Sequence, residues 1–263
     1  MNSHPVRQSF NRAAASYEAS ARLQQQVADQ LIQEIHTSHP NGLHGCVLDA
    51  GCGTGYCLNQ LHRIGPDALL LGVDFAEAML QQNARVSHAL TINGDLQQLP
   101  LANAMVDLYV SSLAWQWCDT EQALREAIRI LKPGGGLWLT TLVDGTFHEM
   151  SKAFRHAGLS PAAHMLHMPP EADVCARFEQ QPELKVAAIR QQAITTWHPD
   201  FTELRRSIRG VGANRLPTSL QTTAHEAIDR AMRARLIEAY ESLRTPRGLP
   251  LTYHVLTIHA QRI

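Results

Sequence analysis

The segment from Val47 to Gly55, with the sequence VLDAGCGTG, constrains the fold of this chain more than any other. A short apolar run, Cys46 to Ala50, is typical of a buried strand, and an amphipathic stretch, Tyr56 to Ile64, follows the segment. Between them lie three glycines in alternate positions: Gly51, Gly53 and Gly55. Glycine tolerates positive φ and lets a ligand approach the backbone without a Cβ in the way. The pattern predicts strand, tight turn and helix, with a nucleotide-binding floor at the carboxyl end of a parallel strand.

The spacing of these glycines narrows the kind of ligand. A dinucleotide-binding turn has the spacing Gly-x-Gly-x-x-Gly, and here the third glycine comes one residue early, which disfavours a nicotinamide oxidoreductase. No Gly-Lys-Ser/Thr follows, so the turn is not a P-loop. Asp49 precedes the turn, and a carboxylate there would repel a pyrophosphate but suit a ligand that carries positive charge. A glycine-rich turn with no ligand is the alternative. The pattern Asp-x-Gly-x-Gly-x-Gly resembles the first motif of class I methyltransferases, which bind S-adenosylmethionine (SAM).

Strands and helices are predicted to alternate through the first half of the chain. The predicted strands are Cys46–Ala50, Ala68–Val73, Ala89–Ile92, Val106–Ser111 and Gly136–Leu142. The predicted helices between them are Tyr56–Ile64, Ala76–Ala84 and Thr120–Leu131, with Thr120 as N-cap. This order predicts an α/β fold with a doubly wound, mostly parallel sheet, similar to the Rossmann-like class I methyltransferases.

The regular alternation is lost after Asp144, and we expect one domain, residues 1–263, with a helical lid. The expected pieces outside the sheet core are helices at Phe10–Ile35, Phe147–Ala157, Phe201–Arg209 and Thr222–Leu243, a loop at Pro161–Pro170, and strands at Val186–Thr196 and Tyr253–Ala260. We interpret residues 1–40, 145–185 and 200–245 as elements of a lid over the cofactor cleft.

Acidic residues follow successive predicted strands, where ligands of an open parallel sheet bind. Asp74 can accept both ribose hydroxyl protons of a nucleoside, and Asp95 can accept the adenine amino group. Phe75 and Met79 can cover the adenine. A loop cap is the simpler interpretation of any one acid, but three acids beside a glycine turn favour a ligand. The predicted cofactor-binding residues are Asp49, Gly51, Cys52, Gly53, Asp74, Phe75, Met79, Asp95, Leu96 and Leu113.

Five further segments resemble a narrower family, the malonyl-acyl-carrier-protein O-methyltransferases of biotin synthesis. They are Phe10–Tyr17, Leu113–Cys118, Thr140–Val143, Gly210–Ala213 and Pro250–His254, and the resemblance covers residues 7 to 260. Family members often carry lysine where this chain has Arg209, which keeps the positive charge. The resemblance implies methylation of the free carboxylate of malonyl-acyl carrier protein, with S-adenosylhomocysteine as the second product. The malonyl methyl ester would prime pimeloyl and finally biotin synthesis.

This chemistry needs no general base, because a carboxylate with a pKa of about 4 is already ionised at pH 7. Accordingly, the sequence offers no obvious His–Asp pair. We expect an arginine to hold the malonyl carboxylate, with Arg12, Arg209 and Arg215 as candidates, although each could instead form a surface salt bridge. Tyr17 is the predicted catalytic residue beside the sulfonium, with lid packing as the alternative. Trp115 is predicted to line the pantetheine path, although one of Trp115 and Trp117 is expected in the core.

Charge is unevenly distributed, although the chain as a whole carries a formal charge of −1. Residues 201–263 hold ten arginines, no lysine and five acids, so this segment is basic by five. A solvated surface is one interpretation, and a docking face for an acidic acyl carrier protein is the other. The predicted docking residues are Arg205, Arg206, Arg230 and Arg233.

The remaining expectations concern location and partners. Five scattered cysteines without a Cys-x-x-Cys pair predict free thiols and a cytoplasmic protein. We expect no signal peptide, membrane span, metal or nucleic acid, and a monomer that binds acyl carrier protein carrying malonyl-phosphopantetheine. Two alternatives stay open: a SAM-dependent methyltransferase of another small acid or a quinone precursor, and a SAM-binding module without catalysis.

Overall fold

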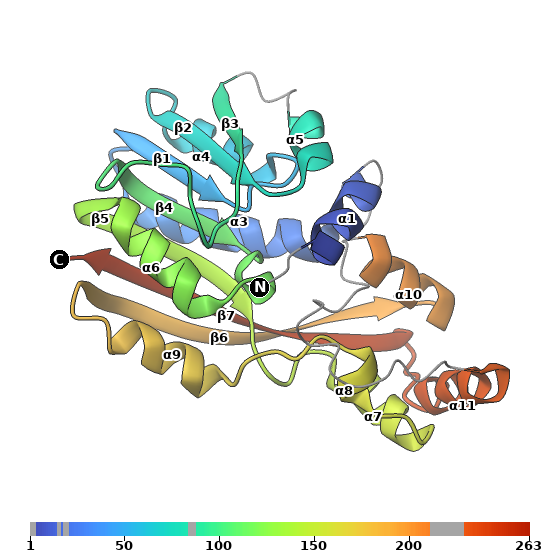
Figure 1. Cartoon of the computed structure of the whole chain (residues 1–263). Helices are drawn as coiled ribbons and strands as arrows, with labels where there is room; N and C mark the ends of the chain where they lie inside the picture. The colour runs from blue at the N-terminus through green and yellow to red at the C-terminus, as the bar shows by residue number, and fades with distance from the viewer. Residues whose placement is uncertain (1–3, 15–16, 18–20, 84–87, 211–228) are drawn as a thin grey trace.

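The computed structural model describes residues 4–14, 17, 21–83, 88–210 and 229–263. Its centre is a seven-stranded sheet with the order β3-β2-β1-β4-β5-β7-β6 (Figure 1). The strands are β1 (Cys46–Ala50), β2 (Leu69–Asp74), β3 (Ala89–Asn93), β4 (Val106–Ser112), β5 (Leu131–Leu142), β6 (Leu184–His198) and β7 (Leu249–Arg262). The first five strands run parallel, and β7 pairs antiparallel with both β5 and β6. The predicted doubly wound, mostly parallel sheet is confirmed, and the strand order reverses between β1 and β4, where such folds bind ligands.

Helices cover both faces of the sheet because successive strand residues point to opposite sides. Val47 packs with α3 (Arg22–Ser38) and α4 (Tyr56–Ile64), in a cluster that contains Leu31 and Leu58. Leu48, the next residue, packs in the cluster shared by α6 (Thr120–Ile130) and α9 (Glu171–Glu179). Both faces of β1 are therefore buried, as expected of a continuous apolar run in a parallel sheet.

The single helix predicted over Phe10–Ile35 is wrong: among the described residues, α1 (His4–Ala13) ends before α3, and Ala21 is the N-cap of α3. The apolar stripe behind the prediction begins only at Leu23, so its period describes α3 alone. The helix α1 packs against α5 (Glu77–Asn83), whereas α3 lies in the layer on the sheet (Figure 1).

Two other predictions need correction. The N-cap of α6 is Asp119, whose side chain accepts hydrogen bonds from the amides of Glu121 and Gln122, and not Thr120. The segment Pro161–Pro170 contains a short helix, α8 (Pro161–His164), where a loop was expected, and α9 follows it. Only Val174 and Phe178 of α9 are buried, which is too short an apolar stripe to predict a helix from period alone.

The remaining helices, α7 (His148–His156), α10 (Phe201–Gly210) and α11 (Arg230–Glu241), pack on the β5–β7 end of the sheet (Figure 1). Part of the helix predicted at Thr222–Leu243 lies outside the described residues. No helix in the described ranges combines the length and apolar character that a bilayer span requires.

Candidate functional site

The glycine turn after β1 adopts the conformation that its sequence predicts. Gly51, Gly53 and Gly55 have φ angles of 82°, 51° and 89°, in the left-handed region that glycine tolerates best. A Cβ on Gly51 would lie 2.4 Å from the Cβ of Ala114, so packing requires this glycine. A Cβ on Gly53 would meet nothing within 4 Å, so the backbone here faces open space that a ligand can enter.

Asp74, at the end of β2, holds this turn in place. Its Oδ2 accepts a hydrogen bond from the Gly53 amide at 2.9 Å, and its Oδ1 accepts one from the Ala76 amide at 2.8 Å. Burial raises the pKa of Asp74 to about 6, against the lowering effect of the amides that donate to it. Sequence reasoning assigned Asp74 to a ribose and missed these backbone partners. Because each carboxylate oxygen accepts about two hydrogen bonds, both roles are compatible.

Asp49, the acid before the turn, is buried and incompletely hydrogen-bonded within the described part of the chain. Its side chain is 1% exposed, and its Oδ2 has no hydrogen-bond partner among the described residues. Burial, and then the charge of Asp74, raise the pKa of Asp49 to about 8. A buried carboxylate without a partner is unfavourable when ionised, and a cationic ligand would relieve this cost. The environment of Asp49 therefore fits a ligand with positive charge.

Asn83 belongs to the same site, and sequence reasoning missed it. It is fully buried on α5, and its Nδ2 lies 3.3 Å from the Gly53 carbonyl and 3.4 Å from the Cys52 sulfur. Its position four residues after Met79, on the same helix face, was the available signal. Met79 and Cys52 are themselves buried at 1% and 6% exposure; Met79 packs in the cluster beneath α1, and Cys52 packs in the cluster that includes α4.

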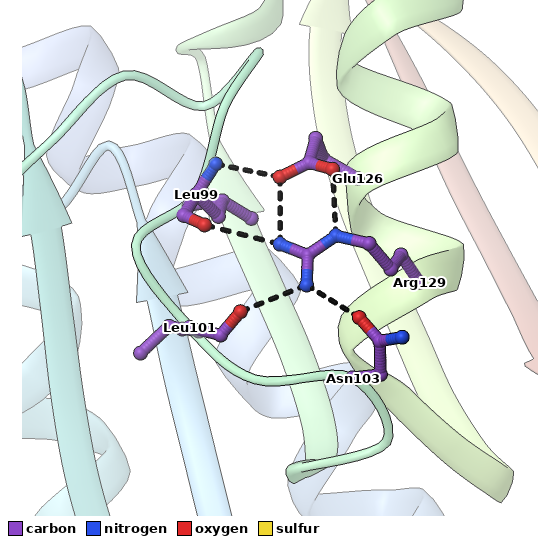
Figure 2. Close-up of polar contacts among 5 residues, drawn as sticks. All are labelled: Leu99, Leu101, Asn103, Glu126 and Arg129. Atoms are coloured by element: carbon purple, nitrogen blue, oxygen red, sulfur yellow. Dashed lines mark hydrogen bonds and ion pairs between the residues drawn. The ribbon is translucent and has the colours of Figure 1, made fainter.

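The loop after β3 carries Asp95 and is held by α6 (Figure 2). Asp95 Oδ1 accepts the amide of Gln97 at 2.9 Å, and Leu96 is buried in the core. Arg129 of α6 donates to the carbonyls of Leu99 and Leu101 at 3.0 and 2.8 Å, and to Asn103 Oδ1 at 2.8 Å. Glu126 pairs with Arg129 and accepts the Leu99 amide. One arginine therefore fixes the loop that positions the predicted adenine acceptor.

Leu113, directly after β4, has a φ of 50°, which is unusual for a residue with a side chain. Its amide donates to the carbonyl and the hydroxyl oxygen of Thr140 on β5, at 3.0 and 3.1 Å. The next residue, Ala114, packs on Gly51. The loop after β4 is thereby pressed against the glycine turn, and such strained backbone is concentrated at functional sites.

The N-terminal helix α1 reaches the same edge of the sheet. The ring of Phe10 lies 5.9 Å from that of Phe75 and 5.6 Å from that of Trp117. Asn11 Oδ1 accepts the Ala78 amide at 2.9 Å, in the first turn of α5. Tyr17 is partly buried and packs in this cluster. The predicted catalytic tyrosine and the predicted adenine cover, Phe75, therefore belong to one group of side chains.

The other predicted substrate and docking residues are placed as follows. Arg12 is exposed on α1, the side chain of Arg209 is not described, and Arg215 lies outside the described residues. Trp115 is 1% exposed, donates to the Tyr109 hydroxyl at 3.1 Å and packs in the core, although it also lines a pocket. Arg206 pairs with Glu203 on α10, Arg205 is partly buried, and Arg230 and Arg233 are exposed on the neighbouring α11.

No cluster of three or more histidine, cysteine or acidic side chains able to hold a metal occurs within the described ranges. All five cysteines are free thiols.

Comparisons with known proteins identify relatives of this chain and solved structures with a similar fold. Residues 48–139 match a family model described as a methyltransferase domain. The chain is 39% identical to a malonyl-[acyl-carrier protein] O-methyltransferase of Dechloromonas aromatica (strain RCB), over 98% of this chain and 94% of that protein. It is 38% identical to the protein of the same name from Herminiimonas arsenicoxydans, over 100% of this chain and 97% of that protein.

Among solved structures, the chain resembles the geranyl diphosphate C-methyltransferase of Streptomyces coelicolor A3(2), solved with Mg²⁺, geranyl-S-thiolodiphosphate and S-adenosyl-L-homocysteine. The TM-score is 0.52 at 17% identity, covering 88% of this chain and 74% of that one. At this identity the likeness concerns the fold alone.

Proposed function

The chain belongs to the malonyl-[acyl-carrier protein] O-methyltransferase family, and on that premise we propose that it methylates the free carboxylate of malonyl-acyl carrier protein, using SAM. The similarity over nearly the whole length of both chains is the observation that carries this function. The product is the malonyl methyl ester that primes pimeloyl and biotin synthesis, with S-adenosylhomocysteine as the second product. Asp49, whose buried Oδ2 has no hydrogen-bond partner among the described residues, and the open floor at Gly53 support a cationic nucleoside cofactor at this site.

When bound, SAM supplies a methyl group activated by a positively charged sulfur. In this proposal Asp49 balances the positive charge of the cofactor, Asp74 accepts from the ribose, and Asp95 accepts from the adenine. The chain contributes positioning and exclusion of water, because the malonyl carboxylate is already ionised at pH 7. Holding two reactants in the correct geometry contributes roughly 7–11 kcal/mol to such reactions.

The lid and the substrate residues stay part of the proposal. Since α3 packs in the layer that covers the sheet, the N-terminal part of the lid is proposed to be α1 together with Tyr17. Tyr17 would orient the methyl group, and one of Arg12, Arg209 and Arg215 would hold the malonyl carboxylate.

The arginines of α10 and α11 are proposed to attract the acidic carrier protein. Arg230 and Arg233 are the strongest candidates, because both are exposed, whereas Arg206 is paired with Glu203. We also propose that the protein acts as a monomer in the cytoplasm, where its five free thiols would stay reduced.

The decisive test is mass spectrometry of malonyl-acyl carrier protein after incubation with this protein and SAM. We expect one added methyl group, and none when an acetyl group replaces the malonyl group, since acetyl has no free carboxylate. Equal activity on free malonate or malonyl-coenzyme A would favour a small-acid methyltransferase. SAM binding without any turnover would favour a binding module.

A further inference from the structure

Gln97 lies between the proposed adenine acceptor and the start of α6, and its side-chain amide binds both. Its Nε2 donates to both oxygens of Asp95, at 3.0 Å to Oδ1 and 3.3 Å to Oδ2. Its Oε1 accepts the backbone amide of Asp119, the N-cap of α6, at 2.8 Å. The contact with Asp119 spans 22 positions of the chain, so Gln97 joins the loop after β3 to the loop after β4.

The two partners together determine which way the Gln97 amide points. The backbone N–H of Asp119 can only donate, so it faces the side-chain oxygen. An ionised carboxylate can only accept, so Asp95 faces the NH2 group. Among side chains of about this length, glutamate could serve only the Asp119 end and methionine could serve neither. Glutamine is therefore matched to this position at both ends.

The contacts with Gln97 divide the acceptor capacity of Asp95 unequally between its two oxygens. Oδ1 accepts two donors, the backbone amide and the side-chain amide of Gln97, at 2.9 and 3.0 Å. Within the described part of the chain, Oδ2 accepts only the longer contact, at 3.3 Å. Because a carboxylate oxygen accepts about two hydrogen bonds, Oδ2 keeps capacity for a donor from a ligand. Asp95 is also partly exposed, whereas Asp49 and Asp74 are buried.

Asp119 is a rigid anchor for this arrangement because its own side chain caps α6. Its Oδ1 accepts the amides of Glu121 and Gln122 at 3.0 and 3.1 Å, and the buried face of α6 packs in the core. Gln97 therefore fastens Asp95 to a helix that is packed on the sheet. Without this side chain, only the backbone amide of Gln97 would still donate to Asp95, and the carboxylate would be free to turn about its side-chain bonds.

We propose that Gln97 is a positioning residue for recognition of the purine base: it holds Asp95 so that Oδ2 accepts the amino group of the adenine. The inference rests on the proposed function, which supplies SAM as the cofactor and Asp95 as the adenine acceptor. Gln97 would not touch the cofactor and would act only through Asp95. An acceptor that is held in place before binding loses less freedom on binding, and it favours a base that carries the matching donor.

The test compares the binding of two ligands by calorimetry: S-adenosylhomocysteine, and its analogue with hydrogen in place of the purine amino group. Wild type should bind S-adenosylhomocysteine about tenfold more tightly, as expected for a hydrogen bond to a charged acceptor. In Gln97→Met this preference should fall to about threefold or less, because Asp95 can turn away. Gln98→Met, the same change at the exposed neighbouring position, should keep the tenfold preference.

A purely structural role of Gln97 would give a different result. A loosened loop would weaken the binding of both ligands by the same factor, and a preference that stays tenfold in Gln97→Met would overturn the proposal. Gln97→Glu, measured at pH 8, is a second variant that keeps an acceptor for Asp119 but has no donor for Asp95. Its preference should also fall to about threefold or less, and a tenfold preference in this variant would count equally against the proposal.

The methyl-transfer assay separates this inference from the proposed function. If malonyl-acyl carrier protein is methylated but wild type binds the two ligands equally, the positioning role fails and the function stands. If Gln97→Met lowers the preference but wild type methylates no carrier protein, the function fails and the positioning role stands.

Discussion

Two buried carboxylates, one on a parallel strand of the sheet and one beside its antiparallel strands, differ in their hydrogen bonding. Glu149 of α7 is 6% exposed, and both of its oxygens accept hydrogen bonds from Thr252 of β7, from the backbone amide and the hydroxyl. Asp49 of β1 is 1% exposed, and one of its oxygens has no partner within the described residues. The acid beside the antiparallel strands is satisfied by the protein itself, whereas the acid on the parallel strand keeps an oxygen that the described residues do not satisfy.

In our proposal, this difference separates a residue that stabilises the fold, Glu149, from one that serves a ligand, Asp49. Local rules of hydrogen bonding are violated mainly at functional sites, where the cost is offset when the ligand binds. The unusual backbone of Leu113 and the three glycines with positive φ lie at the same edge as Asp49. Strained backbone and an unpaired buried oxygen therefore lie at the same edge of the sheet.

Of the substitutions that this comparison suggests, a change of Asp49 is expected to have the largest effect, on the affinity for SAM. Asp49→Asn should weaken SAM binding by on the order of 1.5–3 kcal/mol, because a charged acceptor is lost. Calorimetry at pH 8 measures this. In the wild type, affinity should rise from pH 6 to pH 9, because the pKa of Asp49 is raised to about 8 and only the ionised form attracts a cation. Affinity of the variant that equals wild type at pH 8 would contradict the assignment.

The same substitution should act in the opposite direction on the protein without ligand. The folded pKa of Asp49, about 8, exceeds the ordinary value of 3.8, so its contribution to stability is full below pH 4 and is lost as pH rises towards 8. Asp49→Asn should therefore have a higher Tm than wild type at pH 8, and this difference should shrink towards pH 4. Thermal unfolding of both proteins at pH 4 and pH 8 measures the sign of this Tm difference.

For the carboxylate that the protein itself satisfies, Glu149→Gln should lower the free energy of unfolding by about 2 kcal/mol, because the glutamine amide leaves one Thr252 donor without an acceptor. Denaturant titration measures this loss. The affinity of the folded variant for SAM should be unchanged, since Glu149 lies away from the glycine turn. Weaker SAM binding with unchanged stability would reverse the roles that we assign to the two carboxylates.

A smaller effect is expected where α1 covers the cofactor edge. In wild type, amide hydrogen exchange of α1 should slow when SAM is added. Phe10→Ala removes the contacts to Phe75 and Trp117, so this protection should fall by about 1–2 kcal/mol. Arg7→Ala, at an exposed position of the same helix, is the control and should keep the protection. If the rate of amide hydrogen exchange in α1 of wild type does not change when SAM is added, the proposal that α1 is part of a lid is wrong.

The smallest effect is expected on the exposed face of α11. Arg230→Glu with Arg233→Glu should raise the KM for malonyl-acyl carrier protein about three- to tenfold at low salt, since exposed charges contribute less than about 1 kcal/mol each. Salt should mimic the variant, because the Debye length is about 8 Å at physiological ionic strength. Arg63→Glu with Lys185→Glu, at exposed positions of α4 and β6, is the charge-matched control. An equal rise in KM for the control would indicate net charge and not a docking face.

The two regions also differ in how much of their structure the sequence predicts. The bounds of β1 and the helix after the glycine turn were predicted correctly, because apolar runs and glycine spacing are local signals. The contact of Glu149 with Thr252 spans 103 positions, and no local pattern indicates it. The N-cap of α6 was misplaced by one residue because Asp119 and Thr120 are both good capping residues, and only the backbone geometry decides between them.

For the candidate site, sequence reasoning found the acids at the strand ends but not what holds them. Asp74 accepts two backbone amides, and Asn83 and Arg129 act through residues remote in sequence. These contacts depend on how α5 and α6 dock on the sheet, which the periodicity of a single helix cannot show.

The bond between Arg129 and the loop after β3 sets an order of assembly during synthesis of the chain (Figure 2). The glycine turn, Asp49 and Asp74 lie within residues 49–74, so this half of the site can form once the first strands have left the ribosome. The loop that carries Asp95 is fastened only after residue 129 has been added and α6 has formed. In a chain that stops short of α6, the loop with the proposed adenine acceptor Asp95 would lack these bonds, whereas the proposed ribose acceptor Asp74 already has its partners Gly53 and Ala76 in the sequence.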